Sequence, residues 1–511
     1  MPHSLAALLL CLSLVAAAAE PPVSATPAAI EAAPPLREAR VMGREDLGTW
    51  DDVFVMREQA TLLLRDGTDL YALSATAGTP QAIASRPDLA GTKVIACVDA
   101  GERRWVFLYS ELRTPFAVDV RSGLVAEFGI PPLPYTDHHF PWLGPVLVSP
   151  LAGTALITIG GPEIDSWVLP HNWPIYFWLD LATGRTRAIP IGWNPCWFSA
   201  DLETAVFSVP SATSAGPLPY LQVPLDTRTC EPLAEIPDFT QVDGIEATND
   251  IADVLLPMYR RRAGLPEHDF LTGLTWHGTS ISLTIPGSDD SYLRTAVGND
   301  QALAFYLQPK DMSYVLASPL WIVDLTRGRQ LHRIAEAAVD FTLLDHGSCL
   351  FVTVADKFEL DKSKSFSEVW YCRADGKGRW NLMEGIERLP PLKVPIAEKS
   401  DVKDYSEANL YPGLGAQAQV ALCIFSQYQE DRRASKQFVE SRSHHDVMLV
   451  GAAGERYHTD LFRGDGFANM ILPVTTSRVL TGTYESDPTT KPVTRRTHLR
   501  AITLEATPSG K

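Results

Sequence analysis

Two histidine doublets are the residues of this sequence best suited to chemistry. Asp137-His138-His139 lies in one predicted loop, and His444-His445-Asp446 lies in another near the C-terminal end. Histidine beside a carboxylate suits binding of a divalent metal or acid–base catalysis. The doublets are far apart in the chain, and most histidines in surface loops are simply solvated. We therefore predict no metal site.

Aromatic side chains gather in the same predicted loops. Large aromatic surfaces with polar neighbours suit the binding of sugars or peptides. The candidate ligand-binding residues are Tyr135, Asp137, His138, His139, Trp142, Trp167, Trp173, Trp193, His444 and His445. Trp197 and Trp321 fall inside predicted strands, and we assign them to the core.

Sequence motifs of several enzyme classes are missing. There is no Gly-x-Ser-x-Gly elbow, no HExxH, no GxxxxGK[ST] phosphate loop and no EF-hand loop. The sequence therefore predicts no cofactor, and it favours a binding protein over an enzyme.

A recurrent turn organises the strands that must position these residues. In "FWLDLATGRTRAIP" a short apolar run ends at Asp180, whose side chain can accept turn amides, and Gly184 tolerates positive φ. Related turns end at Gly78, Gly123, Cys230, Gly278, Gly328, Gly376 and Gly454. Most of these turns recur at intervals of about 48 residues, which is typical of four-stranded propeller blades.

Strand–turn–strand pairs precede these turns, as in "PCWFSADLETAVFSVP" (195–210) and "GPVLVSPLAGTALITIGG" (144–161). Together the two patterns resemble the degenerate WD40-like repeats of TolB-type β-propellers over about residues 50–505. In that family the first turn reads Ser-Pro-Asp-Gly, whereas this chain has Ser199-Ala200-Asp201. The resemblance implies a propeller fold and carries over no catalytic residue.

We therefore predict an all-β fold, a single β-propeller of seven or eight four-stranded antiparallel blades, with eight favoured and little helix. Residues 384–416 are the best candidate for a short helix or an irregular insert. The predicted segments are a signal peptide (1–19), an Ala/Pro-rich tether (20–45), the propeller (46–505) and a flexible tail (506–511).

The start of the chain is typical of an export signal. An apolar run from Leu5 to Val15 precedes the small residues Ala17-Ala18-Ala19, with Glu20 as the expected mature start. A lipoprotein signal at Cys11 is the alternative. The run is too short to span a bilayer comfortably, and no later segment is long and apolar enough. We expect a periplasmic or extracellular protein with no membrane span after processing.

Charge and cysteine content narrow the possibilities further. A net charge of −17 argues against a nucleic-acid partner, because phosphate binding needs a basic face. Six cysteines follow the signal, none in a CxxC pair, and we predict that most are buried thiols. Cys349 and Cys372 are expected to be neighbours on adjacent strands, and so the first candidates for any bridge.

Connections of unequal length suggest a working face. With the strands of a blade lettered A to D, the A-to-B and C-to-D turns are short. Long B-to-C connections (such as 160–174 and 427–445) and the D-to-A connection 131–144 would share the other face. The predicted function is an exported monomeric propeller that binds a protein, peptide or glycan of the cell envelope through this face.

The alternative function is a propeller-fold polysaccharide lyase or glycoside hydrolase. Such an enzyme needs an acid, a base and a cation close together. It would require residues such as Asp137, His138, His139, Glu163 and His444 to converge on the long-loop face.

Overall fold

The structure is a computed structural model of the chain, and it describes residues between 23 and 506 with gaps. The predicted signal peptide lies outside the described residues, and so does the tail beyond residue 506. The described backbone covers 23–24, 29–57, 59–76, 78–100, 102–110, 113–128, 142–149, 154–160, 176–189, 194–198, 204–208, 220–224, 231–232, 258–260, 269–276, 279–286, 291–298, 301–309, 317–326, 330–354, 367–376, 378–386, 401–415, 418–432, 438–462, 468–487 and 494–506.

Strands that are consecutive in the chain pair antiparallel in units of four. The first two units are β4 (Asp52–Met56), β5 (Thr61–Asp66), β6 (Asp69–Ser74) and β7 (Gln81–Ser85), then β8 (Lys93–Ala100), β9 (Arg103–Ser110), β10 (Arg113–Asp119) and β11 (Val125–Glu127). The next two are β12 (Trp142–Ser149), β13 (Thr154–Gly160), β14 (Tyr176–Asp180) and β15 (Thr186–Ile189), then β16 (Asn194–Phe198), β17 (Thr204–Ser208), β18 (Tyr220–Pro224) and β19 (Glu231–Pro232). A three-stranded unit follows: β20 (Met258–Arg260), β21 (Asp269–Trp276) and β22 (Thr279–Pro286).

Later units join into larger sheets because some strands serve two units. One such sheet contains β23 (Ser291–Gly298), β24 (Ala302–Pro309), β25 (Ser318–Asp324), β26 (Gln330–Leu343), β27 (Cys349–Val354), β28 (Ser367–Cys372) and β29 (Gly378–Asn381). The first part of β26 pairs with β25, and its last residues pair with β27. The final sheet contains β30 (Asp401–Pro412), β31 (Val420–Arg432), β32 (Phe438–Gly451), β33 (Arg456–Thr459), β34 (Met470–Thr475), β35 (Arg478–Asp487) and β36 (Thr494–Ala506).

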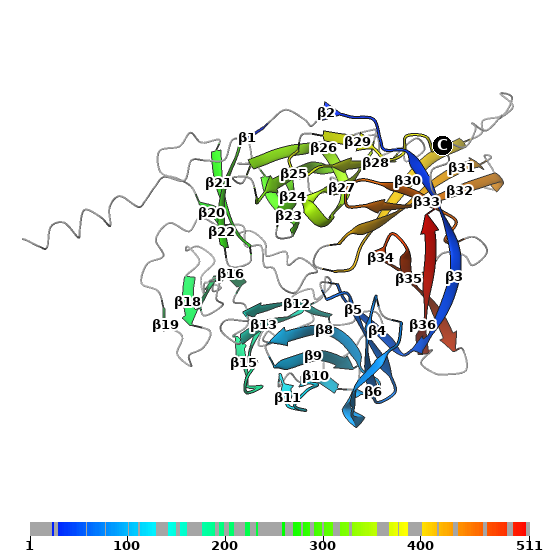
Figure 1. The fold of residues 1–511 in the computed structure, drawn as a ribbon. Coiled ribbons are helices and arrows are strands. Elements are labelled where there is room, and N and C mark those ends of the chain that lie inside the picture. The colour runs from blue at the N-terminus through cyan, green and yellow to red at the C-terminus, as the bar shows by residue number, and fades with distance from the viewer. Residues whose placement is uncertain are drawn as a thin grey trace, which may run out of the picture.

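The N-terminal strand β3 (Leu36–Trp50) brings the two ends of the chain together. Residues 39–50 pair antiparallel with β36 and so complete the last unit, while residues 36–39 pair parallel with β33. β1 (Val23–Ser24) and β2 (Ala29–Ile30) pair parallel with β26 and β29. We call β1, β2 and residues 36–39 the N-terminal strap, because they lie along the edges of three successive units (Figure 1).

The units lie side by side around the molecule, and β3 lies beside β36 where the chain ends meet (Figure 1). Repeated four-stranded antiparallel units are the blades of a β-propeller. The prediction of an all-β, propeller-type fold is confirmed. Among the described strands eight units have four strands and one has three, so the number of blades stays a prediction.

Helix is scarce in the described part of the chain. It consists of the 3-10 turns η1 (Pro87–Leu89) and η2 (Asp345–Gly347). Within these residues no helix has the length and apolar character needed to cross a membrane.

The second strand of a blade is buried on both faces, because blades pack against each other. In β5, Leu62 and Leu64 pack with residues of the last unit, whereas Leu63 packs with residues of β9 and β10. All three side chains are fully buried. Burial on both faces explains why such strands are continuous apolar runs in the sequence and do not alternate with polar residues.

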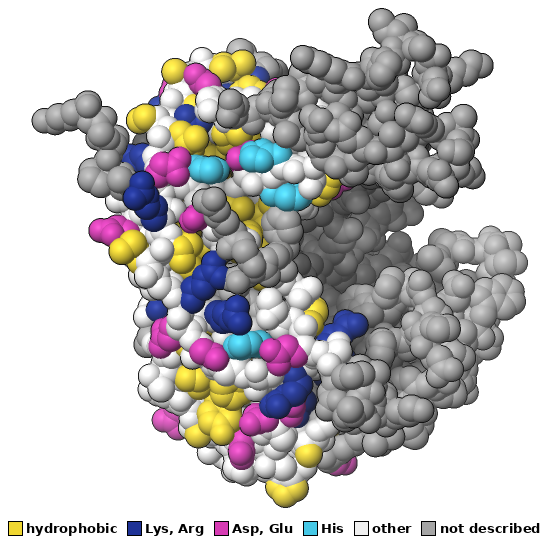
Figure 2. All heavy atoms as spheres, turned by 90° about the vertical axis from the view of Figure 1, so that its right-hand side faces the viewer, with side chains coloured by type: hydrophobic (Ala, Val, Ile, Leu, Met, Phe, Trp, Pro, Cys, Tyr) yellow, Lys and Arg dark blue, Asp and Glu magenta, His cyan; other side chains and the backbone are white. Residues whose placement is uncertain are grey.

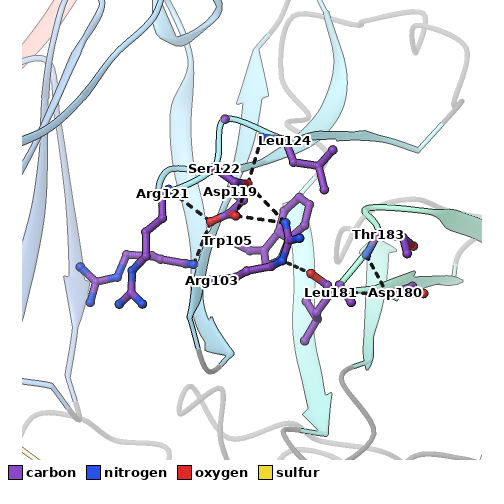
Figure 3. A network of polar contacts seen from close by, with 12 residues as sticks. Arg103, Trp105, Asp119, Arg121, Ser122, Leu124, Asp180, Leu181 and Thr183 are labelled. Atoms are coloured by element: carbon purple, nitrogen blue, oxygen red, sulfur yellow. Dashed lines mark hydrogen bonds and ion pairs between the residues drawn. The ribbon is translucent and has the colours of Figure 1, made fainter.

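An aspartate organises two of the recurrent turns shown in Figure 3. Oδ1 of Asp180 accepts the backbone N–H groups of Ala182 (2.8 Å) and Thr183 (3.0 Å). Asp119 is fully buried and accepts the backbone N–H of Arg104 (2.9 Å) and the hydroxyl of Ser122. Burial raises the pKa of Asp119, but these hydrogen bonds outweigh burial and the net pKa is lowered.

Four of the predicted turn glycines have positive φ. Their values lie between +63° and +82°, at Gly123, Gly184, Gly376 and Gly454. The weaker copy at Gly78 does not share this conformation. Gly328 and the copies at Cys230 and Gly278 lie outside the described residues.

The same turns also join neighbouring blades. At four junctions, a side chain of one blade donates a hydrogen bond to a carbonyl oxygen in the C-to-D turn of the next blade. The pairs are Arg478–Ala75 (2.9 Å), Arg86–Gly123 (2.9 Å), Trp105–Leu181 (2.9 Å) and Tyr371–Ala452 (2.7 Å). The Trp105 contact is visible in Figure 3. One turn therefore closes a hairpin and fixes the position of a blade.

Two sequence-based boundaries are wrong. The predicted tether over residues 20–45 includes residues 36–45 of β3, where Ala39 is buried in the core. This strand was missed because its partners, β33 and β36, are distant in sequence. The predicted helix or insert over residues 384–416 includes β30, which pairs along its whole length with β31.

The cysteine prediction is confirmed in part. Cys349 and Cys372 lie directly opposite each other on β27 and β28. Both are buried free thiols, as are Cys97 and Cys423, so no bridge joins the pair. Burial raises the pKa of Cys372 and Cys423 to about 12.

We expect these four thiols to be unreactive in the folded protein and free after unfolding. Thiol reagents attack the thiolate, which burial disfavours. Alkylation with and without denaturant, followed by peptide mass spectrometry and with no reductant added, measures both properties. A disulfide-linked peptide pair containing Cys349 and Cys372 would contradict the expectation.

Candidate functional site

Most of the predicted ligand-binding residues lie outside the described part of the chain. Tyr135, Asp137, His138, His139, Trp167, Trp173 and Trp193 lie outside the described residues. Trp142 is the first residue of β12, not part of a loop, and its side chain is not described. Trp321, assigned to the core, is buried. The candidate site therefore centres on His444 and His445.

The two histidines lie in a strand, which corrects the predicted loop position. His444 pairs with Gln427 and His445 pairs with Ser426, between β32 and β31. The long connection predicted over 427–445 consists mainly of strand ends on either side of residues 433–437. Because β30, β31 and β32 have 12, 13 and 14 residues and the strands of the first blade have five or six, the sheet is extended here. We call residues 401–408, 426–432 and 438–446 the arm.

His444 belongs to a row of acidic and imidazole side chains on one face of this sheet. Its Nε2 lies 3.2 Å from Oδ1 of Asp446, and Nε2 of His458 lies 3.2 Å from the same oxygen. Nδ1 of His458 lies 3.5 Å from Oε1 of Glu38 on β3. We call these four residues the acid–histidine row. Figure 2 shows histidines beside acidic side chains on this surface.

Asp446 is the buried centre of the row. Its side chain is only 8% exposed, and Oδ2 accepts no hydrogen bond from the described residues. A buried carboxylate needs cationic or donor partners to remain charged. The hydrogen bond to Asp446 raises the pKa of His458 against the effect of burial, with a further contribution from Glu38. The row thus favours an imidazolium at His458.

His445 lies on the other face, in an aromatic environment. Its Nδ1 lies 2.9 Å from Oγ of Ser426, and its ring meets Tyr428 edge-on at 5.8 Å between centroids. Tyr428 in turn stacks on Tyr405 of β30 at 5.0 Å. Burial, together with His444, lowers the pKa of His445. We call Tyr405, Tyr428 and His445 the aromatic ladder.

The two faces of the arm offer different chemistry. The aromatic ladder presents flat, half-buried rings on a paired backbone, which suits stacking on a sugar or a planar side chain. The acid–histidine row can exchange protons and accept hydrogen bonds. No group of three or more His, Cys, Asp or Glu among the described side chains is arranged to hold a metal ion.

Sequence reasoning found the histidine doublet but missed its partners. Glu38, Tyr405, Tyr428 and His458 come from four other strands, so only the pairing register brings them together. The alternation of side chains between the two faces of a strand was the available signal. It places His444 and Asp446 on one face of β32 and His445 on the other.

Neither protein-family models nor curated protein sequences match this chain. Among solved structures it is similar to dipeptidyl peptidase 4 of Porphyromonas gingivalis, with 12% identity over 78% of this chain and 60% of that one (TM-score 0.40). It is also similar to the β-propeller domain of the Trilobed protease from Pyrococcus furiosus, with 12% identity over 70% of this chain and 99% of that one (TM-score 0.33).

An oligogalacturonate lyase is also similar, with 11% identity over 71% of this chain and 88% of that one (TM-score 0.26). The chain spans about 60% of the length of the dipeptidyl peptidase. At such scores the likenesses carry no functional argument, and the propeller architecture rests on this chain's own strand pairing. The chain is similar to propeller-type proteins, and these comparisons show no specific family for it.

Proposed function

We propose that this protein is an exported, monomeric propeller-type module that binds a protein, peptide or glycan of the cell envelope. The observation that carries the proposal is the aromatic ladder. Tyr405, Tyr428 and His445 remain half-exposed, although the core residues of the same three strands are buried. Rings held on a rigid sheet lose little conformational entropy on binding, so they serve well as recognition anchors.

Long connections at the same end of other blades indicate the same working face. Residues 355–366 join β27 to β28, and residues 161–175 join β13 to β14, both as B-to-C connections. The arm is formed by a B and a C strand at their B-to-C ends, together with the start of the A strand β30. The predicted aromatics of this face, among them Trp142 and Trp173, belong to the proposed surface.

Truncating the aromatic ladder is expected to weaken binding without unfolding the protein. A glycan array and a pull-down from envelope extract identify the ligand, and calorimetry then compares variants. Tyr428→Ala should weaken binding about tenfold or more, as truncation of an anchor aromatic does. Tyr484→Ala is the matched control, because Tyr484 is 49% exposed on β35 and packs on Arg495. Equal losses from both variants would reject the ladder as the binding surface.

The acid–histidine row keeps the enzyme alternative open. A carboxylate between two imidazoles can support acid–base catalysis of glycan cleavage. If the array ligand is a polysaccharide, release of reducing ends or of unsaturated products distinguishes cleavage from binding. An enzyme loses this release in Asp446→Asn, whereas a binding module shows none in any variant.

Export has its own test. N-terminal sequencing of the mature protein from the envelope fraction should begin at Glu20, because cleavage is expected after Ala19. Recovery of the uncleaved chain from the cytosol would reject export.

A further inference from the structure

Two histidines hold the closing strand β3, and each lies between two carboxylates. His458 on β33 lies between Glu38 of β3 and Asp446 of β32, at 3.5 Å and 3.2 Å. His498 on β36 lies between Asp46 of β3 and Glu485 of β35, at 2.9 Å and 3.1 Å. In both triads one acid belongs to β3 and the other to the neighbouring sheet strands, so the same chemical device occurs at both ends of β3.

The charge of the imidazole decides how many carboxylates it can hold. A neutral imidazole has one N–H and one lone pair, so it donates to one acid while its lone pair faces the other. An imidazolium has two N–H groups and donates to both. Histidine changes between these forms near neutral pH. Proton loss therefore leaves two acids around a neutral ring with one hydrogen bond instead of two.

Some of the other charged groups around the triads also interact with these histidines and carboxylates. His444 also contacts Asp446, and Arg456, two residues before His458, directs its guanidinium to backbone carbonyls. Near His498, Arg500 interacts with Asp46. Arg496 pairs with Asp51 and Asp66 and so does not replace His498.

The shifts of His458 and Asp46 agree in direction with this geometry. The raised pKa of His458 means that its stabilisation is complete below the ordinary histidine range and is lost as pH rises through the raised value. The pKa of Asp46 is lowered, first by the backbone N–H of Gly48 and then by His498. His445 acts in the opposite direction, because its pKa is lowered and its contribution is lost as pH falls.

We propose that His458 forms a proton-linked latch that fastens β3 at Glu38 when the imidazole is protonated and loosens it when the imidazole is neutral. Loosening β3 weakens ring closure between β33 and β36. It also weakens the strap, since residues 36–39 are both part of the strap and part of β3. The latch needs no ligand and is independent of the proposed binding function.

Hydrogen exchange of the full chain tests the latch. The protection factor of residues 36–50, corrected for the intrinsic effect of pH, is compared at about pH 5.5 and about pH 8, on either side of the histidine range. We expect protection to fall about threefold to tenfold on raising the pH, since partly exposed ion pairs contribute modestly. Residues 103–110 of β9, away from the latch, should show no such fall.

Variants separate the latch from general pH effects. His458→Gln should abolish the pH response of residues 36–50. His346→Asn is the matched control, because His346 is 74% exposed, pairs only weakly with Asp345 and has a φ of +61° that Asn tolerates. It should keep the wild-type response. A wild type whose β3 protection does not change with pH relative to β9 would overturn the proposal, and so would a full response in His458→Gln.

Discussion

Gly454→Ala is expected to destabilise the protein by about 3 kcal/mol or more, which combines strain at positive φ with a steric clash. Gly454 has a φ of +82°, and a Cβ there would lie 2.2 Å from Cζ2 of Trp380. Trp380 is buried and stacks on Tyr371 at 4.4 Å, so it has little room to move. Chemical denaturation followed by circular dichroism measures the loss.

Two other turn glycines separate the causes. Gly67 has a φ of +59° with nothing within 4 Å of its Cβ position, so Gly67→Ala measures conformational strain alone, about 1 kcal/mol. Gly184 has a φ of +70°, and its Cβ would lie 3.0 Å from Leu124 and 3.1 Å from Trp105 of the preceding blade. Gly184→Ala should therefore give an intermediate loss. Three equal losses would show that blade packing contributes nothing at these turns.

This series also shows what the sequence could predict. The Asp-to-Gly turn is local, since Asp180 binds amides two and three residues ahead and Gly184 adopts positive φ. The spacing of such turns was therefore sufficient to predict four-stranded units. The sequence predicts the positive φ of these glycines. It does not predict the close approach of the preceding blade, because the residues of that blade are distant in sequence.

Elements formed by distant residues escaped prediction. Residues 36–45 of β3 fall within the predicted tether, and only their pairing with β33 and β36 identifies them as a strand. The arm reads as a loop, because Gln427 and Ser426 resemble loop residues unless they are matched with His444 and His445. The histidine doublet could be recognised in the sequence, but the geometry of the candidate site depends on the register of the sheet.

Arg456→Met is expected to cost about 3 kcal/mol or more, because removing one partner leaves buried polar groups unsatisfied. The Arg456 side chain is buried at 4% exposure. Nε donates to the carbonyl of Pro34 (2.7 Å), and Nη1 donates to those of Leu382 (2.8 Å) and Glu384 (2.6 Å). Burial lowers its pKa, so the carbonyls compensate for lost hydration.

The position of these carbonyls makes Arg456 the link between strap and blades. Pro34 precedes β3, Leu382 follows β29, and Arg456 itself begins β33. Methionine keeps much of the apolar stem but donates no hydrogen bond. Arg456→Met should therefore expose residues 29–39 to protease and hydrogen exchange while lowering global stability. Arg456→Lys, which keeps a charge and can satisfy fewer carbonyls, should lie between.

Arg373→Ala is the control for this effect, since Arg373 also holds the strap but from the surface. It pairs with Glu31 at 3.1 Å, with side chains 46% and 43% exposed. Water competes for such a pair, so its loss should cost at most about 0.5 kcal/mol. If Arg373→Ala released the strap as fully as Arg456→Met, the exposed ion pair would be the fastening and the buried carbonyl contacts would be secondary. If only Arg456→Met releases it, desolvated hydrogen bonds from Arg456 to two separate segments hold the N-terminal strap on the propeller.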